Sequence, residues 1–411
     1  MILMSDPAFP VRLADRMYQL PGYMFQEINR LRDEKRQAGL DLIDMSMGNP
    51  RDPTPNYIVD KLAEAVQDRR NHRYSMPSGI LNLRNELSKY YQALYDVTLD
   101  PEGEVICTIG SKEGFSHLCL ALIGPGDRAV VPAPAYPIHA YSVVLAGGEP
   151  IRLLVGDDEI YLRDLIRLCE DTATRPKVLF LNYPHNPTGK VVELAFFETI
   201  VDIAKRFGLV VVHDFAYGRI TFDGLKHPSF LQAPGAREVG VEFGTLSKAY
   251  NMAGWRIGYA VGNRGVIQAL NRIKGYFDYG IFQAVQIAAI VALRHGEEDI
   301  ARQVDIYQKR RDLVIGGLRQ AGWEVDMPKA GMFAWVKIPS PYAEEGSLAF
   351  STRLLEEANV VVSPGVGFGP EGEGCLRMAL VENEKRLSQA LRSIRQRFSV
   401  VPQPPQAAGL P

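Results

Sequence analysis

The chain lacks several features that would place it in a specialised class of protein. None of its apolar runs approaches the roughly 18 residues needed to cross a bilayer, so we expect no membrane-spanning helix. Its 46 basic and 48 acidic residues give a net charge of −2 over 411 residues, which argues against nucleic acid as a main partner. The N-terminal stretch MILMSDPAFPVRLADRM has neither a basic start nor a long apolar core. We therefore expect no secretion signal and a cytoplasmic protein.

Cysteine is scarce, and several common catalytic motifs are missing. The four cysteines, Cys107, Cys119, Cys169 and Cys375, have no metal-type spacing, so we expect reduced thiols and no metal site. The sequence contains no Walker motif, no G-x-G-x-x-G after a strand, no H-E-x-x-H and no G-x-S-x-G. The glycine-rich stretch 364–374 has no helix opening after it and is expected to be a loop, which weakens the case for a nucleotide site.

The composition is that of an ordinary globular protein, with 46% hydrophobic and 23% charged residues. The chain is too long for one compact core, so two domains are expected. From about residue 55, helical patterns alternate with apolar runs rich in valine and isoleucine. This alternation predicts a mostly parallel sheet covered by helices on both faces. Near residue 290 the pattern changes to a long helix followed by short strands, which predicts a smaller α+β domain.

These patterns divide the chain into four parts. An N-terminal arm and part of the small domain occupy 1–54, the large domain 55–290, the rest of the small α+β domain 291–400, and a disordered Pro-rich tail 401–411. An amphipathic helix is predicted at 25–38, within the first part. The sequence shows no tandem repeat that would suggest a different organisation.

Polar residues follow four of the predicted strands, at the sheet edge where open parallel sheets bind ligands. Ser111 and Lys112 follow the first strand, Asn186 the second, Asp214 and Tyr217 the third, and Thr245, Ser247 and Lys248 the fourth. The first two of these groups have an ordinary alternative. Ser111 can be a simple helix N-cap with Glu113 completing it, and Asn186 can belong to a turn. Asp214, at the end of a buried strand, requires a cationic or N–H partner.

The stretch TLSKAYNMAGWRIGYAVG places two cations, Lys248 and Arg256, in apolar surroundings without an acidic neighbour. Residues 255–261 alternate as a strand does. An anionic ligand would satisfy both cations, and backbone N–H groups at a helix opening favour a phosphate. Pyridoxal phosphate suits the whole set. Its phosphate would contact Ser111, Lys112, Thr245, Ser247 and Arg256, its ring nitrogen Asp214, its ring oxygen Asn186 and Tyr217, and its aldehyde Lys248 as a Schiff base.

From about residue 21 to residue 398 the sequence resembles the class I and II aminotransferases of fold type I. The matching motifs are NPTG at Asn186, HDFAY at Asp214, TLSK at Lys248, GWRIG at Arg256 and LRMAL at Arg377. LPGYMFQEINRL and IGSKEG resemble the branch that holds LL-diaminopimelate and bacterial alanine (glutamate–pyruvate) aminotransferases. VEFGTLSKAYNMAGWRIGY and VSPGVGFG resemble the alanine members. One departure is the threonine of TLSK, where many relatives have serine, but the hydroxyl is kept.

The resemblance implies a seven-stranded type of sheet and further site residues. Arg377 would bind the substrate α-carboxylate, with Tyr23, Gly48 and Asn186 also on the substrate side. Tyr136 would stack on the cofactor ring. Tyr74 would reach the phosphate of the neighbouring subunit in a homodimer. Lys248, Asp214 and Tyr217 would be the catalytic residues.

The activity implied is transfer of an amino group between an L-amino acid, best matched by alanine, and a 2-oxo acid, either 2-oxoglutarate or pyruvate. The alternatives are an LL-diaminopimelate aminotransferase and another pyridoxal-phosphate enzyme, such as a β-lyase or a decarboxylase. A third alternative is a ligand-sensing regulator built on the same fold. The retained Lys248 and the lack of room for a DNA-binding domain before Met45 argue against a regulator.

Overall fold

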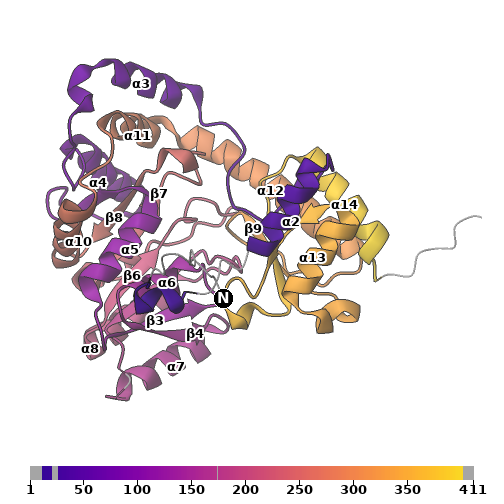
Figure 1. Ribbon diagram of the computed structural model, residues 1–411. Coiled ribbons are helices and arrows are strands. Elements are labelled where there is room, and N and C mark those ends of the chain that lie inside the picture. The colour runs from indigo at the N-terminus through magenta and orange to yellow at the C-terminus, as the bar shows by residue number, and fades with distance from the viewer. Residues whose placement is uncertain (1–11, 21–25, 174, 401–411) are drawn as a thin grey trace, which may run out of the picture. The chain divides into compact units, whose positions relative to one another are not determined.

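The computed structural model describes residues 12–20, 26–173 and 175–400 (Figure 1). Two compact units can be separated, and we describe each by itself. The larger comprises Met1–Tyr23, Asn49–Asp305 and Lys329–Gly331, and the smaller Met24–Gly48, Ile306–Pro328 and Met332–Pro411. Tyr23 and the tail at 401–411 lie outside the described residues. None of the described helices combines the length and apolar composition that crossing a bilayer requires.

A seven-stranded sheet forms the centre of the larger unit, with the strand order β2-β8-β7-β6-β5-β3-β4. The strands are β2 (Val105–Thr108), β3 (Arg128–Ala133), β4 (Glu149–Leu154), β5 (Val178–Asn182), β6 (Val210–Asp214), β7 (Gly240–Thr245) and β8 (Gly258–Gly262). Strand β8 is antiparallel to both of its neighbours, and all other pairs are parallel. The predicted mostly parallel sheet is thereby confirmed.

Side chains alternate between the two faces along each strand, and both faces are covered. On one face, residues such as Val212 and Phe243 join a core cluster with side chains of α5 (Gly110–Leu122), α6 (Ile138–Leu145) and α10 (Arg264–Phe277). On the other face, His213 contacts the ring of Phe197 from α8 (Leu194–Phe207). Because neither face of the central strands meets water, those strands read as nearly continuous apolar runs.

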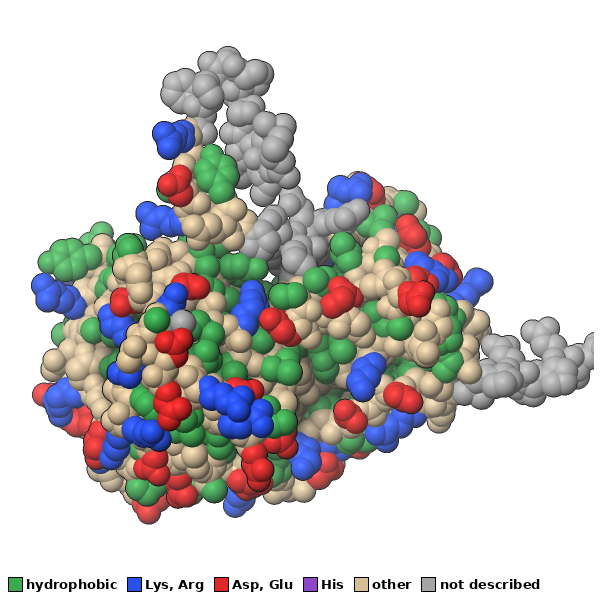
Figure 2. All heavy atoms as spheres, turned by 90° about the horizontal axis from the view of Figure 1, so that it is seen from below, with side chains coloured by type: hydrophobic (Ala, Val, Ile, Leu, Met, Phe, Trp, Pro, Cys, Tyr) green, Lys and Arg blue, Asp and Glu red, His purple; other side chains and the backbone are tan. Residues whose placement is uncertain are grey.

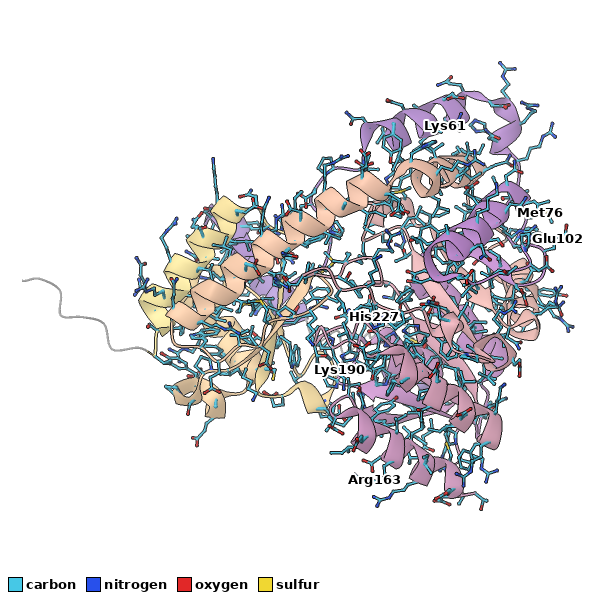
Figure 3. All side chains as sticks on the ribbon, turned by 180° about the vertical axis from the view of Figure 1, so that it is seen from behind. Lys61, Met76, Glu102, Arg163, Lys190 and His227 are labelled. Atoms are coloured by element: carbon cyan, nitrogen blue, oxygen red, sulfur yellow. The ribbon has the colours of Figure 1, made fainter. Side chains whose placement is uncertain are left out.

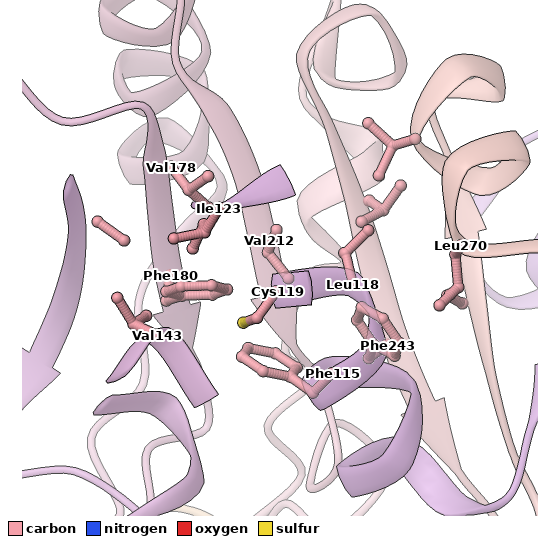
Figure 4. Packing of buried hydrophobic residues seen from close by; sticks show 14 of the residues in the cluster. Phe115, Leu118, Cys119, Ile123, Val143, Val178, Phe180, Val212, Phe243 and Leu270 are labelled. Carbon is pink, nitrogen blue, oxygen red and sulfur yellow. The ribbon is translucent and has the colours of Figure 1, made fainter. Parts of the chain in front are cut away.

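Phe115 anchors α5 in this core. Its ring lies 4.9 Å from the ring of Phe180 and 5.3 Å from that of Phe243, measured between centroids (Figure 4). Aromatic rings at these distances add to the stabilisation that burial provides. Since Phe115 lies only one and a half turns into α5, this packing holds the first turn of the helix against the sheet.

The larger unit has six further helices among the described residues. They are α1 (Asp15–Tyr18), α3 (Asn56–Gln67), α4 (Leu81–Tyr95), α7 (Asp158–Glu170), α9 (Ala236–Val239) and α11 (Gln283–His295). Helix α11 packs against both α3 and α4. Arg163 of α7 is exposed, whereas His227 lies among buried side chains (Figure 3). Acidic and basic side chains are interspersed on the face seen in Figure 2, in keeping with the near-neutral charge.

The smaller unit combines segments from both ends of the chain. Strand β1 (Ile43–Asp44) pairs in parallel with β10 (Val360–Val361), and β11 (Ser363–Pro364), β12 (Cys375–Ala379) and β9 (Phe333–Lys337) form an antiparallel sheet. Its helices are α2 (Gln26–Gln37), α13 (Ser347–Ala358) and α14 (Glu384–Phe398). The change of unit after Asp305 falls inside α12 (Glu297–Gln320), whereas the sequence pattern places it near 290. One continuous helix crosses the division, so no loop marks it.

Two strands differ from the sequence expectations. Strand β4 was not predicted, because it is the edge strand and carries Pro150 and Arg152, so it lacks a continuous apolar run. The strand expected at 255–261 begins only at Gly258. Arg256 cannot belong to it, because its φ of 53° is left-handed and turns the chain before β8 starts.

Candidate active site

Most of the predicted site residues lie at one edge of the central sheet, at the C-terminal ends of β2, β5, β6 and β7. These four strands run in the same direction, so their ends meet at that edge. Asp214 is the last residue of β6 and Thr245 the last of β7. Helix α5 opens two residues after β2 ends, and Asn186 follows β5 by four residues. This is the edge where open α/β sheets bind ligands.

Asp214 is nearly buried, and its carboxylate has two partners. Its Oδ2 lies 3.0 Å from Nε2 of His139, and its Oδ1 accepts a hydrogen bond of 3.3 Å from the backbone N–H of Ala216. The partner that the sequence analysis required for this carboxylate is therefore present. His139 lies on α6 and is fully buried. Sequence analysis missed His139, because a single histidine on an apolar helix does not indicate a contact with Asp214, which lies 75 positions later in the chain.

Asn186 and Tyr217 come together, although 31 residues separate them. The Asn186 Nδ2 donates to the Tyr217 hydroxyl over 3.4 Å, and both side chains are buried. Asn182, at the end of β5, positions this pair: its Oδ1 accepts from the backbone N–H of Asn186 at 2.9 Å, and its Nδ2 donates to the Asp214 carbonyl at 2.8 Å. Asn182 was also missed by sequence analysis, where it reads as the polar end of a strand.

The opening of α5 forms a backbone cradle. The helix begins at Gly110, and its N-cap residue is Ile109, which makes no side-chain cap hydrogen bond. The simple reading of Ser111 as the N-cap is therefore wrong. A Cβ on Gly258 of β8 would lie only 2.7 Å from the Ser111 nitrogen, so β8 passes directly against the first turn of the helix.

Arg256 and the hydroxyl pair complete this cradle. A Cβ on Gly110 would lie 2.3 Å from Nη2 of Arg256, so the guanidinium rests against the helix opening. The same guanidinium donates to the carbonyls of Ala253 at 3.1 Å and Ile109 at 3.4 Å. The Thr245 hydroxyl lies 2.9 Å from the Ser247 hydroxyl and accepts from the Ser247 N–H at 3.1 Å. Arg256 is exposed, although its apolar neighbours in the sequence suggest buried surroundings.

Lys248 directly follows this hydroxyl pair in the chain, and Tyr136 follows β3. Lys248 is half-buried in the turn that follows β7 and the Thr245–Ser247 pair. The ring of Tyr136 stands edge-on to the ring of His139, with 6.1 Å between centroids. His139 therefore contacts both Tyr136 and Asp214. The Lys112 ammonium is exposed and lies 6.0 Å from the Tyr136 ring centroid.

This set of donors fits pyridoxal phosphate. The cradle has backbone N–H groups, hydroxyls and a guanidinium, which match a phosphate. The buried carboxylate of Asp214 matches a protonated ring nitrogen, and the Asn186–Tyr217 pair matches a ring oxygen. The glycines at 110 and 258 allow the close approach of Arg256 and of the Ser111 backbone, because a Cβ at either position would clash with these atoms.

Arg377 lies in the smaller unit, on β12, and is held from several sides. Its Nη2 donates to the Ser46 carbonyl at 2.9 Å, and its guanidinium lies 4.1 Å from the Phe333 ring centroid and 4.5 Å from that of Phe368. A Cβ on Gly48 would lie 2.4 Å from the Phe333 ring, so Gly48 and Arg377 share this ring. The arrangement fixes the plane of the guanidinium, which is the requirement for bidentate carboxylate binding.

Tyr74 stands apart from the strand-end residues. Its side chain is 91% exposed, and its ring contacts that of Tyr279 at 5.5 Å between centroids.

Comparison with known proteins shows the family of this chain. Residues 41–394 match the family described as aminotransferase class I and II. The chain belongs to this family. It is 49% identical to the glutamate–pyruvate aminotransferase AlaC of Escherichia coli (strain K12), over 95% of this chain and 94% of that protein. It is 44% identical to an LL-diaminopimelate aminotransferase of Moorella thermoacetica, over 93% of this chain and 97% of that protein.

Solved structures of similar proteins share the fold of this aminotransferase. Substrate-bound BacF from Bacillus subtilis superposes with a TM-score of 0.88 at 35% identity, covering 94% of this chain and 98% of that one. An aminotransferase from Staphylococcus aureus gives a TM-score of 0.84 at 32% identity, covering 93% and 98%. The protein is thus an aminotransferase, and the family implies pyridoxal phosphate.

The cradle can be tested with Gly110→Ala. Alanine is strained at the φ of 71° found here, and its Cβ would displace the Arg256 guanidinium. We expect the affinity of the apoprotein for pyridoxal phosphate, measured by absorbance titration, to fall about tenfold or more, equivalent to about 1.4 kcal/mol. Gly126→Ala is the matched control, because Gly126 also has a positive φ, of 88°, but has open space around its Cβ position. Equal affinities in the two variants would contradict the assignment.

Proposed function

We propose that this aminotransferase moves an amino group reversibly between L-alanine and 2-oxoglutarate, giving pyruvate and glutamate, with pyridoxal phosphate bound at the strand-end edge. The observation that carries the cofactor assignment is the convergence of independent groups on that edge. The Asp214–His139 contact, the Asn186–Tyr217 contact and the cradle at Gly110 lie at the ends of β6, β5 and β2, and His139 reaches Asp214 from α6. Each group fits a different part of pyridoxal phosphate: the ring nitrogen, the ring oxygen or the phosphate.

Asp214 would keep the ring nitrogen of the cofactor protonated. Pyridoxal phosphate then supplies an electron sink for the charge that develops at the substrate Cα. His139 orients the carboxylate, since its Nε2 lies 3.0 Å from Oδ2 in a site without water access to the imidazole. Asn186 and Tyr217 would donate hydrogen bonds to the ring oxygen.

Lys248 would bind the aldehyde of the cofactor covalently. As a free amine, Lys248 would act as the general base for the proton on the substrate Cα, while the cofactor would supply the electron sink. This role is supported by its position in the chain after β7, next to Thr245 and Ser247, which are proposed phosphate contacts.

Arg377 would bind the α-carboxylate that all amino-acid substrates share. Two parallel hydrogen bonds from one guanidinium require a fixed plane, and the Phe333 and Phe368 rings supply it. Lysine cannot reproduce this geometry. Because the α-carboxylate is common to all candidates, Arg377 supports amino-acid binding but not the choice of alanine.

The choice of alanine is supported by the 49% identity to the glutamate–pyruvate aminotransferase and by the segments around Lys248 and Ser363. A second candidate, LL-diaminopimelate, is supported by identities of 44% and 43% to enzymes of that name. The two substrates differ physically. Alanine ends in a methyl group, whereas diaminopimelate carries a second charged end that would need fixed polar partners far from the cofactor.

The lysine assignment predicts where borohydride will attach the cofactor. Reduction of the native enzyme followed by peptide mapping should place the label on Lys248. Lys248→Ala should fold, lose the covalent label and retain almost no transamination. The control is Lys112→Ala, because Lys112 lies in the first turn of α5 and is exposed. A label on Lys112 would refute the assignment.

The substrate proposal predicts the ratio of two specificity constants. We expect kcat/KM for L-alanine with 2-oxoglutarate to exceed that for LL-diaminopimelate with 2-oxoglutarate. Some activity with other small or acidic amino acids is expected, because a missing apolar group discriminates by only about 1–3 kcal/mol. If diaminopimelate were preferred tenfold or more, a difference of about 1.4 kcal/mol in transition-state binding, the alanine proposal would be wrong and the second candidate would replace it.

We further propose a homodimer in which Tyr74 serves the partner's site. Its support is a set of exposed apolar side chains that surrounds Tyr74. In this set, Met76 is 62% exposed and Phe277 63%, and Tyr279 contacts Tyr74 directly. A Cβ on Gly280 would meet the carbonyl of Met76, so the two segments adjoin. Exposed apolar side chains gathered in this way mark protein interfaces.

The homodimer proposal predicts complementation between two impaired variants. Inactive Lys248→Ala is mixed with Tyr74→Phe under conditions of demonstrated subunit exchange. A hybrid dimer then contains one site with both residues intact, so activity should rise above that of either variant alone. The control is a mixture of each variant with itself. No gain in activity after proven exchange would count against a shared site.

A further inference from the structure

Four charged or titratable side chains lie together behind the first turn of α5. Glu113 and His117 come from α5, Lys274 from α10, and Asp278 follows α10 directly. The Lys274 ammonium is 3.0 Å from Glu113 Oε1 and 3.0 Å from Asp278 Oδ1. His117 Nδ1 is 2.5 Å from Glu113 Oε1 and 3.3 Å from Asp278 Oδ2. The side chain of Lys274 is completely buried, so its charge depends on these carboxylates.

Glu113 connects this group to the cradle. Its Oε2 accepts a hydrogen bond of 2.7 Å from the backbone N–H of Ile109, the N-cap residue of α5, while its Oε1 faces Lys274. The carbonyl of the same Ile109 accepts from Arg256. The turn that opens α5 is therefore held from one side by Arg256 and from the other by a carboxylate fastened to α10.

A carboxylate this close to a phosphate site would repel the phosphate if it were not neutralised. Burial raises the pKa of the Glu113 carboxyl, but the effects of His117 and Lys274 outweigh burial and lower the pKa to about 2. The carboxyl is therefore ionised at neutral pH. Burial and the neighbouring Glu113 raise the pKa of Asp278. The carboxylates of Glu113 and Asp278 and the imidazole of His117 lie within 4.8 Å of one another, as metal ligands do. The Lys274 ammonium, however, already takes the place of a cation between the two carboxylates.

We propose that Glu113 and Lys274 are positioning residues for the cofactor phosphate. Glu113 holds the turn at Ile109 and Gly110 in the conformation that presents the backbone N–H groups of α5. Lys274 cancels the charge of Glu113, so the turn stays attractive to an anion. This inference rests on the proposed binding of pyridoxal phosphate at the cradle and adds the means by which the cradle is held and kept electrically favourable.

The test compares two substitutions of Glu113. Glu113→Ala removes the acceptor for Ile109, so the affinities of the apoprotein for pyridoxal phosphate and for inorganic phosphate should both fall about tenfold. Glu113→Gln keeps an oxygen acceptor and leaves Lys274 paired with Asp278, so it should stay within about threefold of the native affinities. Native affinity in Glu113→Ala would overturn the positioning role.

The charge role has its own signature. Lys274→Met leaves the carboxylates uncompensated and should weaken both affinities at least tenfold. Adding Glu113→Gln to Lys274→Met should then recover affinity, because it removes a negative charge near the phosphate. Failure of the double variant to bind more tightly than Lys274→Met would overturn the charge role. If Lys274→Met does not fold, Lys274→Gln takes its place in the same comparison.

Glu86→Ala is the matched control. Glu86 forms a partly buried ion pair of 2.7 Å with Arg294, in the same unit but on α4 and α11. Its loss should lower the denaturation temperature without changing either affinity. The outcome for the proposed function is read separately, from borohydride labelling of the native enzyme. A native enzyme that takes up no label contradicts the function, whereas native labelling with unchanged Glu113 and Lys274 variants contradicts only this inference.

Discussion

The site depends on the close approach of α5 to the strand ends. A helix can present its first N–H groups to an anion only if that end is fixed and uncapped, and both conditions hold here. Phe115 packs the start of α5 into the core, and Gly258 allows β8 to pass beneath it. Ile109, the N-cap residue, makes no side-chain cap hydrogen bond. The Glu113 carboxylate accepts a hydrogen bond from the backbone N–H of Ile109. The first N–H groups beyond it are directed toward the edge of the sheet.

The buried charges around this edge are handled in a consistent way. Asp214 has His139 and a backbone N–H, and Glu113 has Lys274 and His117. On the opposite face of the sheet, Glu242 accepts hydrogen bonds from Tyr91, Ser229 and Phe230, and its Oε2 lies 2.8 Å from His213. Uncompensated burial of any of these carboxylates would cost several kcal/mol. Each pair therefore avoids this cost and leaves a defined electrostatic environment at the strand ends.

Much of this arrangement is predictable from the sequence because it is local. Apolar runs such as Val210–Val212 identify strands that are buried on both faces, and the residue after each run must stand at a strand end. Asp214, Asn186 and Lys248 follow from that rule together with the family motifs. Strand β4 does not, because an edge strand need not be apolar. The start of β8 does not either, because the left-handed backbone of Arg256 depends on its contacts with Ala253 and Ile109.

The sequence by itself determined the family, the mostly parallel sheet and the residues at the strand ends, since these rest on periodicity and short motifs. Only the tertiary structure decided which distant residues support them. His139 meets Asp214 across 75 positions, and Lys274 meets Glu113 across 161. No spacing within the sequence predicts such pairs, because they form only when the helices pack on one face of the sheet. The same packing brings Lys274 of α10 to Glu113, whose carboxylate holds the Ile109 N–H at the start of α5.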